Sequence, residues 1–372
     1  MKFAIITHVQ HIESANQYFG YAPYVREMNI WFKYVDEVII VAPLKSDNLT
    51  KIDVAYKHGN IDFIKVPDFS FNSFNARLKA FFKFPIIFRS VFYAMKNSDH
   101  IHLRCPGNMG MIACLVQILF PNKPKTAKYA GNWDPKSKQP YTYKVQKWIL
   151  KNSFLTRNID VLVYGDWNNQ SKNIKPFFTA TYSEPEKEIV EKPSLSNTIE
   201  FIFVGSLVSG KNPIYAIKLA KALIENKYKV NLNIYGEGTE RFELENYIKA
   251  NGLENLVVLH GNQNNDILKK AYQKSHFVIL PSKSEGWPKA IAEGMFWGCV
   301  PIASKVSCVP FMLDYGNRGV LLDMDLEKDV NQIDQIIKDE KSFFAKSSLA
   351  VKWSQNYTTD FFEAEIKKLL LK

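Results

Sequence analysis

Short runs of apolar, mostly β-branched residues alternate with longer stretches of helical periodicity along the chain. This alternation is typical of parallel sheets flanked by helices, so the pattern predicts an α/β fold. In the first half it predicts strands over residues 3–7, 37–42, 61–66, 100–103, 126–130 and 160–164. In the second half it predicts strands over residues 200–205, 230–235, 256–260, 277–280 and 300–303, and helices over 213–225, 239–250, 266–273 and 288–297.

The two sets of strands are separated by a charged, proline-containing segment, residues 183–198, which we interpret as an interdomain linker. The pattern therefore predicts a Rossmann-like domain over residues 1–182 and a second over 199–355. Residues 356–372 form a helical segment that we expect to cross back toward the first domain. Because open α/β sheets bind ligands at the carboxyl ends of their strands, we expect the domains to face each other across a cleft.

The net positive charge of the chain lies in its first half. The formal net charge is +11; residues 1–183 carry 24 basic and 12 acidic side chains, whereas residues 184–372 carry 24 and 25. With 46% hydrophobic and 23% charged residues the chain is ordinary for a globular protein, so the basic excess indicates an anionic partner of the first half.

Residues 69–98 contain no acidic residue and interleave five cations with aromatic side chains. Pro85 is predicted to divide this stretch into two short helices. The pattern suits a helix lying on an anionic membrane surface. Stacking on nucleic-acid bases and a pair of core-facing helices with a solvated basic face are the alternatives. We find no zinc-finger spacing, RNP-type motif or helix-turn-helix signature, so nucleic acid is not expected as a partner.

Nothing in the sequence predicts secretion or a membrane span. The longest apolar runs, such as residues 111–120, are about half the roughly 20 residues that cross a bilayer. The first residues lack a small-residue cleavage site and read as a strand. The four cysteines form no CxxC pair and no zinc-type cluster. We therefore expect a cytoplasmic protein, with peripheral contact to the inner face of the cytoplasmic membrane at most.

Three strand-to-helix turns of the second half carry residues suited to phosphate chemistry. Residues 204–213, VGSLVSGKNP, combine glycines, a helix start and Lys211, which together suit a diphosphate. Residues 235–238, YGEG, again end a strand in glycines. Residues 284–294, SEGWPKAIAEG, place Glu285 on a loop and Glu293 on a helix that Pro288 is predicted to begin. The backbone amides of this helix start would face an anion.

These turns resemble glycosyltransferases of the GT-B fold, most closely glycosyltransferase family 4. Glu285 and Glu293, with seven residues between them, match the E-x7-E motif of that family. Residues 204–212, 235–261 and 316–323 resemble its phosphate-binding loop, its next two strands and its late G-x-x-G-x-L-x-D segment, in the same order. The resemblance covers residues 199–370. Ser206 stands where many relatives carry an arginine, so Lys211 would take more of the phosphate role.

The resemblance implies roles for individual residues. Glu285 and Lys211 would be catalytic, with Glu285 on the donor sugar, Lys211 on the diphosphate and Glu293 on the ribose. The implied donor-binding set is Gly205, Ser206, Lys211, Tyr235, Gly236, Gly238, Gly261, Ser284, Glu285, Gly286, Trp287, Pro288, Lys289, Ala290 and Glu293. No metal and no cofactor is implied. Asp323-Met324-Asp325 has the form of a metal-binding Asp-x-Asp motif, but its position favours an ordinary turn.

The first half matches the family more loosely. Gly20 and Tyr21 occupy the place of its glycine-rich loop, and Arg104, Asn132 and Asp134 follow or end predicted strands. These five are candidates for acceptor or sugar contacts. For Arg104, Asn132 and Asp134 an ordinary structural role is the alternative. Residues 129–134 hold no histidine where some members place one. His8 and His11 could reach the cleft or be ordinary loop residues.

The resemblance implies a retaining, metal-independent glycosyltransferase. It would move a sugar from a UDP- or GDP-sugar to a glycan or lipid-linked acceptor in surface polysaccharide or glycoconjugate biosynthesis. The alternatives are another GT-B enzyme, such as a phosphorylase or nucleotide-sugar epimerase, and a noncatalytic protein that binds nucleotide sugars or glycans.

Overall fold

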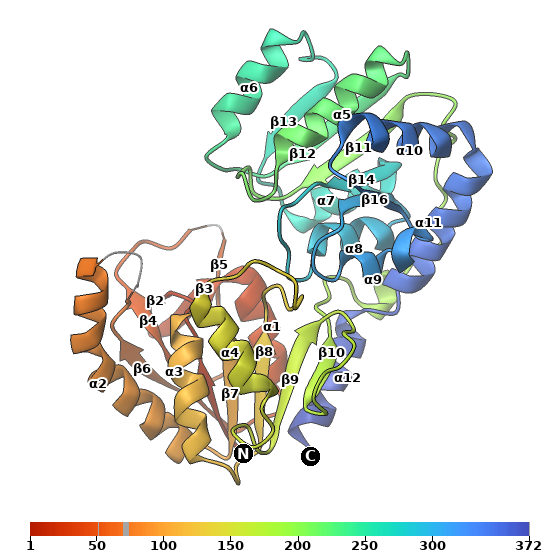
Figure 1. Ribbon diagram of the computed structural model, residues 1–372. Coiled ribbons are helices and arrows are strands. Elements are labelled where there is room, and N and C mark those ends of the chain that lie inside the picture. The colour runs from red at the N-terminus through yellow and green to blue at the C-terminus, as the bar shows by residue number, and fades with distance from the viewer. Residues whose placement is uncertain (51, 70–73, 372) are drawn as a thin grey trace. The chain divides into compact units, whose positions relative to one another are not determined.

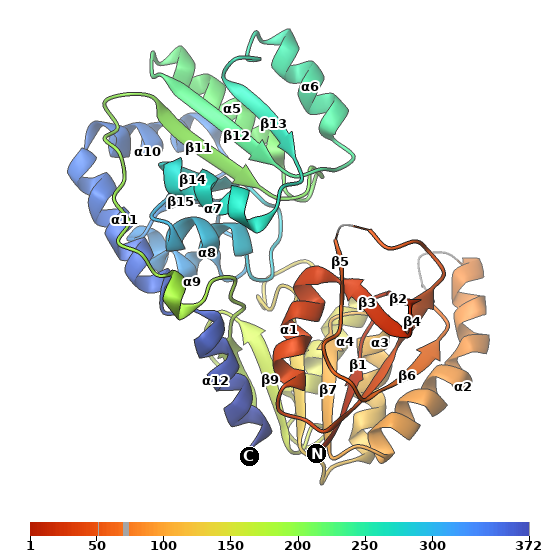
Figure 2. The same ribbon diagram turned by 180° about the vertical axis from the view of Figure 1, so that it is seen from behind.

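The computed structural model describes residues 1–50, 52–69 and 74–371. The chain divides into two compact units (Figures 1 and 2). Unit 1 comprises Met1–Phe177 and Glu363–Lys372, and unit 2 comprises Phe178–Phe362. Each unit has its own sheet with helices on both faces, as the alternation of apolar runs and helical stretches predicts.

The sheet of unit 1 follows the order β10-β9-β8-β7-β1-β4-β2-β3-β5, with β6 paired to β4. All of these pairs are parallel except β2 with β3 and β3 with β5. The strands are β1 (Lys2–Ile6), β2 (His11–Ser14), β3 (Gln17–Tyr21), β4 (Glu37–Lys45), β5 (Asp53–Ala55), β6 (Ile61–Val66), β7 (His100–Cys105), β8 (Lys125–Tyr129), β9 (Ile159–Tyr164) and β10 (Ile174–Phe177).

Helices α2 (Phe74–Lys96), α3 (Asn108–Val116) and α4 (Tyr141–Lys151) cover one face of this sheet, and α1 (Ala22–Phe32) covers the other (Figures 1 and 2). A short 3-10 turn, η1 (Gln117–Leu119), follows α3. The expected break at Pro85 is wrong, because α2 continues through the proline. Ile87 and Val91, on the next turns, are fully buried against the sheet, and this packing holds the helix together across one missing hydrogen bond.

Unit 2 has a fully parallel sheet in the order β13-β12-β11-β14-β15-β16. Its strands are β11 (Ile199–Val204), β12 (Val230–Tyr235), β13 (Val257–Gly261), β14 (Phe277–Leu280), β15 (Val300–Ser304) and β16 (Val320–Leu322). Its helices are α5 (Pro213–Glu225), α6 (Arg241–Ala250), α7 (Asn265–Lys274), α8 (Lys289–Phe296), α9 (Val309–Met312), α10 (Leu326–Lys338) and α11 (Glu340–Ser354), with 3-10 turns η2 (Glu184–Glu186) and η3 (Asp314–Gly316).

The segment that we expected to be a linker, residues 183–198, lies within unit 2 and packs onto it. The Lys192 side chain is buried, and its Nζ donates to the backbone oxygens of Tyr272 (2.7 Å), Gln273 (3.1 Å) and Ser275 (2.7 Å). These carbonyls end α7, where a cation is favoured. The charged residues of the segment thus belong to the surface of unit 2 and not to a linker between the units.

The chain returns from unit 2 to unit 1 within α12 (Thr359–Leu370). In unit 1 the Glu363 carboxylate accepts hydrogen bonds from Lys33 Nζ and from the Tyr34 hydroxyl, both at 2.7 Å. Within the described ranges, no helix is long and apolar enough to span a bilayer.

Candidate functional site

Three loops at the carboxyl ends of β11, β12 and β13 contact one another through their backbones. The Gly205 amide donates to Tyr235 O and the Gly236 amide to Gly261 O, both at 2.9 Å, and the Leu207 amide donates to Glu237 O at 2.9 Å. These bonds hold the predicted phosphate loop against the next two loops at one edge of the sheet. This is the edge at which parallel α/β sheets bind their ligands.

Glycine is required at two of these positions by the close approach of the loops. A Cβ at Gly236, where φ is +144°, would lie 1.9 Å from Gly205 O, and a Cβ at Gly238 would lie 2.3 Å from Leu207 O. The glycines that we singled out for phosphate binding therefore also carry a packing role. Gly261 has φ +70°, and a Cβ there would lie 2.8 Å from Glu237 Oε1.

Lys211 and Glu285, the two predicted catalytic residues, lie in direct contact. Lys211 Nζ is 2.5 Å from Glu285 Oε1, and the side chains are 30% and 6% exposed. The loop that carries Glu285 is fixed to the loop that carries Lys211, because the Lys283 amide donates to Gly210 O at 2.8 Å and Lys283 Nζ to Ser209 Oγ at 2.7 Å. A carboxylate and a partly exposed ammonium group are thus held together beside the glycine loops.

Helix α8 begins beside this pair. Pro288 is its N-cap rather than its first helical residue, a shift of one position from the prediction. The amides of a first helical turn have no acceptor within their own helix, so they face outward to whatever lies at that end. The Trp287 side chain, in contrast, is 7% exposed and packs against Trp353 and Tyr357. Its indole belongs to the core of unit 2, so a donor contact through the Trp287 side chain is not expected.

Glu293 lies on α8 in a different environment from Glu285. Its Oε1 accepts a hydrogen bond from Thr181 Oγ1 at 2.7 Å, and its Oε2 accepts one from the Tyr272 hydroxyl at 3.2 Å. Burial raises the pKa of the carboxyl, and the two hydrogen bonds oppose that rise. The adjoining cavity has a volume of about 10 Å³, the size of one water molecule. Sequence reasoning missed Thr181 and Tyr272, which carry no local motif.

The other predicted donor residues lie along the same loops. Ser206, Gly238 and Ser284 are exposed, and Gly205, Gly286, Lys289 and Ala290 are half-buried. The Tyr235 ring stacks on His260 with the centroids 4.5 Å apart and the planes 10° apart. His260 Nε2 is in turn hydrogen-bonded to Asn233 Oδ1 at 2.8 Å. The aromatic pair stands at the ends of β12 and β13, next to the glycine loops.

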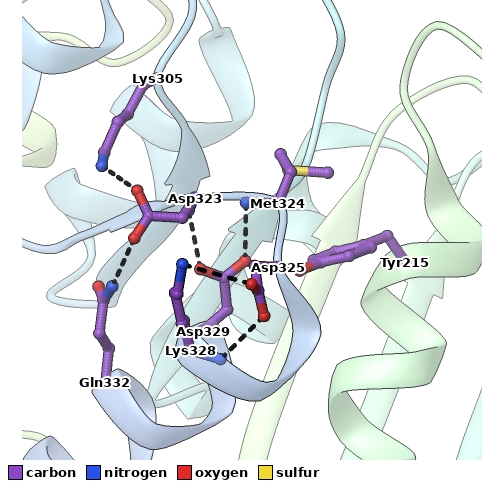
Figure 3. A network of polar contacts seen from close by, with 8 residues as sticks. All are labelled: Tyr215, Lys305, Asp323, Met324, Asp325, Lys328, Asp329 and Gln332. Carbon is purple, nitrogen blue, oxygen red and sulfur yellow. Dashed lines mark hydrogen bonds and ion pairs between the residues drawn. The ribbon is translucent and has the colours of Figure 1, made fainter.

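Asp323-Met324-Asp325 forms a turn at the start of α10 (Figure 3). The Asp329 carboxylate accepts hydrogen bonds from the amides of Asp323 (2.7 Å) and Met324 (3.1 Å) and from the Tyr215 hydroxyl (2.6 Å). Asp325 caps the helix through the Lys328 amide, and Asp323 pairs with Lys305. The two aspartates thus serve the turn, as the sequence position favoured.

In unit 1 the residues expected to form a glycine-rich loop instead build a β-hairpin. Gly20 lies in β3, paired with His11 of β2, and the turn is made by Ala15 and Asn16 with φ +50° and +59°. Tyr21 is the N-cap of α1 and its side chain is exposed. The polar hairpin residues gave no alternating pattern from which these strands could be predicted.

Arg104 is part of a buried charge cluster. Its Nη1 lies 3.0 Å from Glu27 Oε1, and Lys128 Nζ lies 3.1 Å from the same oxygen. The Arg104 guanidinium also stands 5.4 Å from the centre of the Tyr24 ring. Sequence reasoning found Arg104 but missed both partners, because Glu27 and Lys128 lie on elements distant in sequence.

Asn132 and Asp134 stabilise a local turn after β8. Asn132 Oδ1 accepts from the Asp134 amide at 2.9 Å, and Asp134 Oδ1 accepts from the Lys136 amide at 2.8 Å. Of the two histidines, His11 is buried with its Nε2 2.7 Å from the Tyr56 hydroxyl, and burial lowers its pKa to about 4. His8 is exposed beside Gly107. An ordinary structural role accounts for the contacts of Asn132, Asp134 and His11.

Comparison with known proteins finds a likeness in the part of the chain that carries the Lys211–Glu285 pair. A family model described as glycosyl transferases group 1 matches residues 185–358. This part of the chain is similar to that family. The matched range contains every residue that we predicted for donor binding.

Relatives extend the likeness beyond the range that the family model matches. Protein CapJ of Staphylococcus aureus is 25% identical over 289 residues, which cover 74% of this chain and 72% of CapJ. An uncharacterized glycosyltransferase of Haemophilus influenzae is 28% identical over 169 residues, 45% of this chain; the match spans about half the length of that relative, 47%.

The fold of the whole chain is that of GT-B glycosyltransferases. The Anabaena protein HepE, in a crystal structure with UDP and glucose, superposes with a TM-score of 0.67 and 17% identity, covering 100% of this chain and 99% of HepE. The predicted fold class is thereby confirmed.

Proposed function

We propose that the protein is a retaining, metal-independent glycosyltransferase. It moves a sugar from a nucleotide diphosphate sugar of UDP or GDP type to a glycan or lipid-linked acceptor in surface polysaccharide or glycoconjugate biosynthesis. The observation that carries the proposal is the Lys211–Glu285 contact of 2.5 Å beside the glycine loops and the start of α8.

The pair suits the chemistry of the leaving group. When the bond between the anomeric carbon and the β-phosphate oxygen breaks, negative charge grows on the diphosphate. Lys211 and the amides of the Gly205 loop and of the α8 first turn would face that charge, and fixed donors of this kind supply large stabilisation. A bound diphosphate would compete with Glu285 for Lys211 and leave the Glu285 carboxylate to accept hydrogen bonds from sugar hydroxyls.

The relatives support the proposed sugar transfer and suggest the first donor to test. The family model is one of glycosyl transferases, and HepE was crystallised with UDP and glucose. A UDP-sugar is therefore the first donor in the experiment, and a GDP-sugar the second.

The test is slow hydrolysis of the donor by the purified protein without an acceptor. We expect release of UDP or GDP from one class of nucleotide sugar, and a loss of at least about 100-fold in the Lys211→Ala variant. Lys218→Ala is the matched control, because Lys218 is exposed on α5, the helix that follows the Lys211 loop. Binding without hydrolysis would favour the noncatalytic alternative, and neither binding nor hydrolysis of any nucleotide sugar would overturn the proposal.

Two further readouts address the finer points. Proton NMR of the first sugar released from an α-linked donor should show the α-anomer before mutarotation if the reaction retains configuration. Turnover should be unchanged after treatment with EDTA if no metal takes part. A β-anomer, or a loss of turnover that added Mg²⁺ restores, would contradict the respective part of the proposal.

We further propose that unit 1 contacts an anionic membrane surface from the cytoplasmic side. The helices α2, α3 and α4, which lie next to one another on one face of the sheet (Figure 1), contain no aspartate or glutamate. They carry eight basic residues, five on α2 and three on α4. This face is therefore positive, as an anionic surface requires.

The outer side of α2 combines this charge with apolar side chains. Phe82, Ile86, Arg89, Tyr93 and Lys96 are all exposed, and their spacing of four, three, four and three residues places them on one face of the helix. Leu115 of α3 and Trp148 of α4 are exposed as well. Rings and aliphatic groups at the headgroup level, with cations on the phosphates, are the features of an interfacial helix. The part of the predicted stretch at residues 70–73 lies outside the described residues.

A further inference from the structure

Unit 1 contains a cavity whose lining includes none of the residues that we assign to donor binding. It has a volume of about 850 Å³ and lies at the amino ends of β7, β8, β9 and β10, where His100, Lys125 and Ile159 begin or border their strands. Leu369 of α12 forms part of its wall. The carboxyl ends of the same strands lie about 20 Å away, because six residues of strand span that length.

The wall of this amino-edge cavity is fixed by hydrogen bonds. Asn173 Nδ2 donates to Leu150 O at 2.9 Å, and Thr156 Oγ1 donates to Asn152 O at 2.6 Å. The Asn158 side chain donates to Pro121 O at 3.1 Å. The loops after η1, after α4 and before β10 are thereby tied to their neighbours, so the cavity has a fixed shape.

The lining of the cavity presents polar groups that solvent reaches. The side chains of Asn122, Ser153 and Asn158 are exposed and offer amide and hydroxyl groups. Such groups both donate and accept hydrogen bonds, as the hydroxyls of a sugar require. Ser171 Oγ and Asn173 Oδ1 lie buried behind the cavity surface, without a partner within the described part of the chain.

The charge of the cavity is positive. Its lining holds three cations, Lys125, Arg157 and Lys172, and one carboxylate, Asp160. Lys125 is 2% exposed, and its Nζ donates to Phe120 O at 2.6 Å and to Lys123 O at 3.2 Å, which uses two of its three protons. Burial lowers the pKa of Lys125 to about 8 and that of His100 to about 4. His100 is therefore neutral, and a bound anion would stabilise the charged form of Lys125.

We propose that the amino-edge cavity binds an anionic saccharide, a sugar ring that carries a carboxylate or a phosphate group. The cations take the acid group, and the exposed side chains of Asn122, Ser153 and Asn158 take the hydroxyls. The volume far exceeds that of an inorganic phosphate ion. The aromatic ring in the lining, the imidazole of His100, is buried and offers a base no exposed stacking surface. The site binds and does not transfer, because it lies at the edge opposite to the carboxyl ends of the strands.

Calorimetric titration of the purified full chain tests the assignment with glucuronic acid, glucose 1-phosphate, glucose and inorganic phosphate as probes. We expect both charged sugars to bind at least fivefold more tightly than glucose or phosphate. The Arg157→Ala, Lys172→Ala double variant should weaken the charged sugars at least fivefold. Lys175→Ala is the matched control, because Lys175 is exposed on β10 outside the lining, and it should change nothing.

The Ser153→Ala variant separates binding from folding. Ser153 is exposed in the lining of the cavity, so loss of its hydroxyl should leave the melting temperature unchanged while it weakens the binding of the charged sugars. Binding should persist in Lys211→Ala, so failure of the proposed transfer activity does not decide this outcome. Absence of binding, binding of phosphate as tight as that of the sugars, or insensitivity to the double variant would overturn the assignment.

Discussion

Glu27 is a single carboxylate held between two cations inside unit 1. Its side chain is 6% exposed, Lys128 is fully buried and Arg104 is 13% exposed. The Glu27 carboxylate thus faces two positive charges that have left water. Removal of one partner from such a buried cluster leaves a charge without compensation, which costs far more than the pair itself contributes.

We therefore predict that Glu27→Gln lowers the free energy of unfolding by about 3 kcal/mol. Urea unfolding followed by circular dichroism measures this change. Glu13→Gln is the control, because Glu13 is exposed on β2 and its loss should change the stability by less than about 0.5 kcal/mol. Equal effects of the two substitutions would show that the cluster does not depend on Glu27.

Glu293 gives a prediction about pH, because burial raises the pKa of its carboxyl in the folded chain above the ordinary value of 4.5. The folded state then holds a proton that the unfolded state has released, so stability is lost as the pH rises from 4.5 through the raised pKa. The Glu293→Gln variant lacks this loss. We expect its stability relative to the wild type to increase from pH 4.5 to pH 7 in melting experiments. Glu254→Gln, at an exposed position, should show no such trend.

Single residues also show how far the sequence predicts the site. Lys211 and Glu285 lie in recognisable motifs on adjacent loops, and the structure brings them together. The partners of Glu293 and Arg104 were not predictable, because Thr181 lies 112 residues from Glu293 and Glu27 lies 77 residues from Arg104. Contacts over such separations depend on the fold and leave no local pattern. The buried indole of Trp287 was missed for the same reason, since its neighbours come from α11 and beyond.

At the scale of elements, the loops after β11 and β12 depend on glycine. Gly236→Ala would place a Cβ 1.9 Å from the Gly205 carbonyl oxygen, at a backbone φ of +144°. We predict a loss of about 3 kcal/mol in unfolding free energy and a loss of donor binding, since the loops must separate. Gly210→Ala is the control in the same region, because no atom lies within 4 Å of a Cβ there. A Gly236→Ala variant as stable as Gly210→Ala would contradict the packing role.

Helix α2 contains Pro85 in its interior. Pro85 is exposed, and the helix continues on both sides of it. We predict that Pro85→Ala raises the unfolding free energy by about 1–3 kcal/mol, because the amide can then join the helix. Arg89→Ala on the same helix should change it by less than about 0.5 kcal/mol. A destabilised Pro85→Ala variant would show that the helix is bent around the proline.

The pattern of the sequence predicts the central strands of both sheets within one to three residues at each end, because buried parallel strands are continuous apolar runs. It does not predict β2, β3, β5, β10 and β16. β2 and β3 are half-exposed strands with polar residues, and β5, β10 and β16 have three or four residues each. The predicted break at Pro85 was wrong because proline usually ends a helix, whereas here the packing of Ile87 and Val91 against the sheet keeps the helix continuous.

At the scale of the molecule, the charge asymmetry between the halves gives a prediction for unit 1. Each exposed cation near an anionic bilayer contributes roughly 1 kcal/mol, so Arg89→Ala with Lys96→Ala should weaken binding to phosphatidylserine vesicles roughly 30-fold. Flotation at about 0.1 M salt measures this binding. Lys218→Ala with Lys270→Ala removes the same charge from exposed sites of unit 2 and should have no effect. Equal flotation of the two double variants would contradict the assigned surface.

The chain crosses between its units twice, from Phe177 to Phe178 and again inside α12 from Phe362 to Glu363. A proteolytic cut at the first crossing would produce two polypeptides, yet the second would still carry the segment that supplies Glu363 to Lys33 and Tyr34 of the first. The two pieces thus behave like the fragments of a split protein. Each piece lacks part of unit 1, so unit 1 forms only when both are mixed.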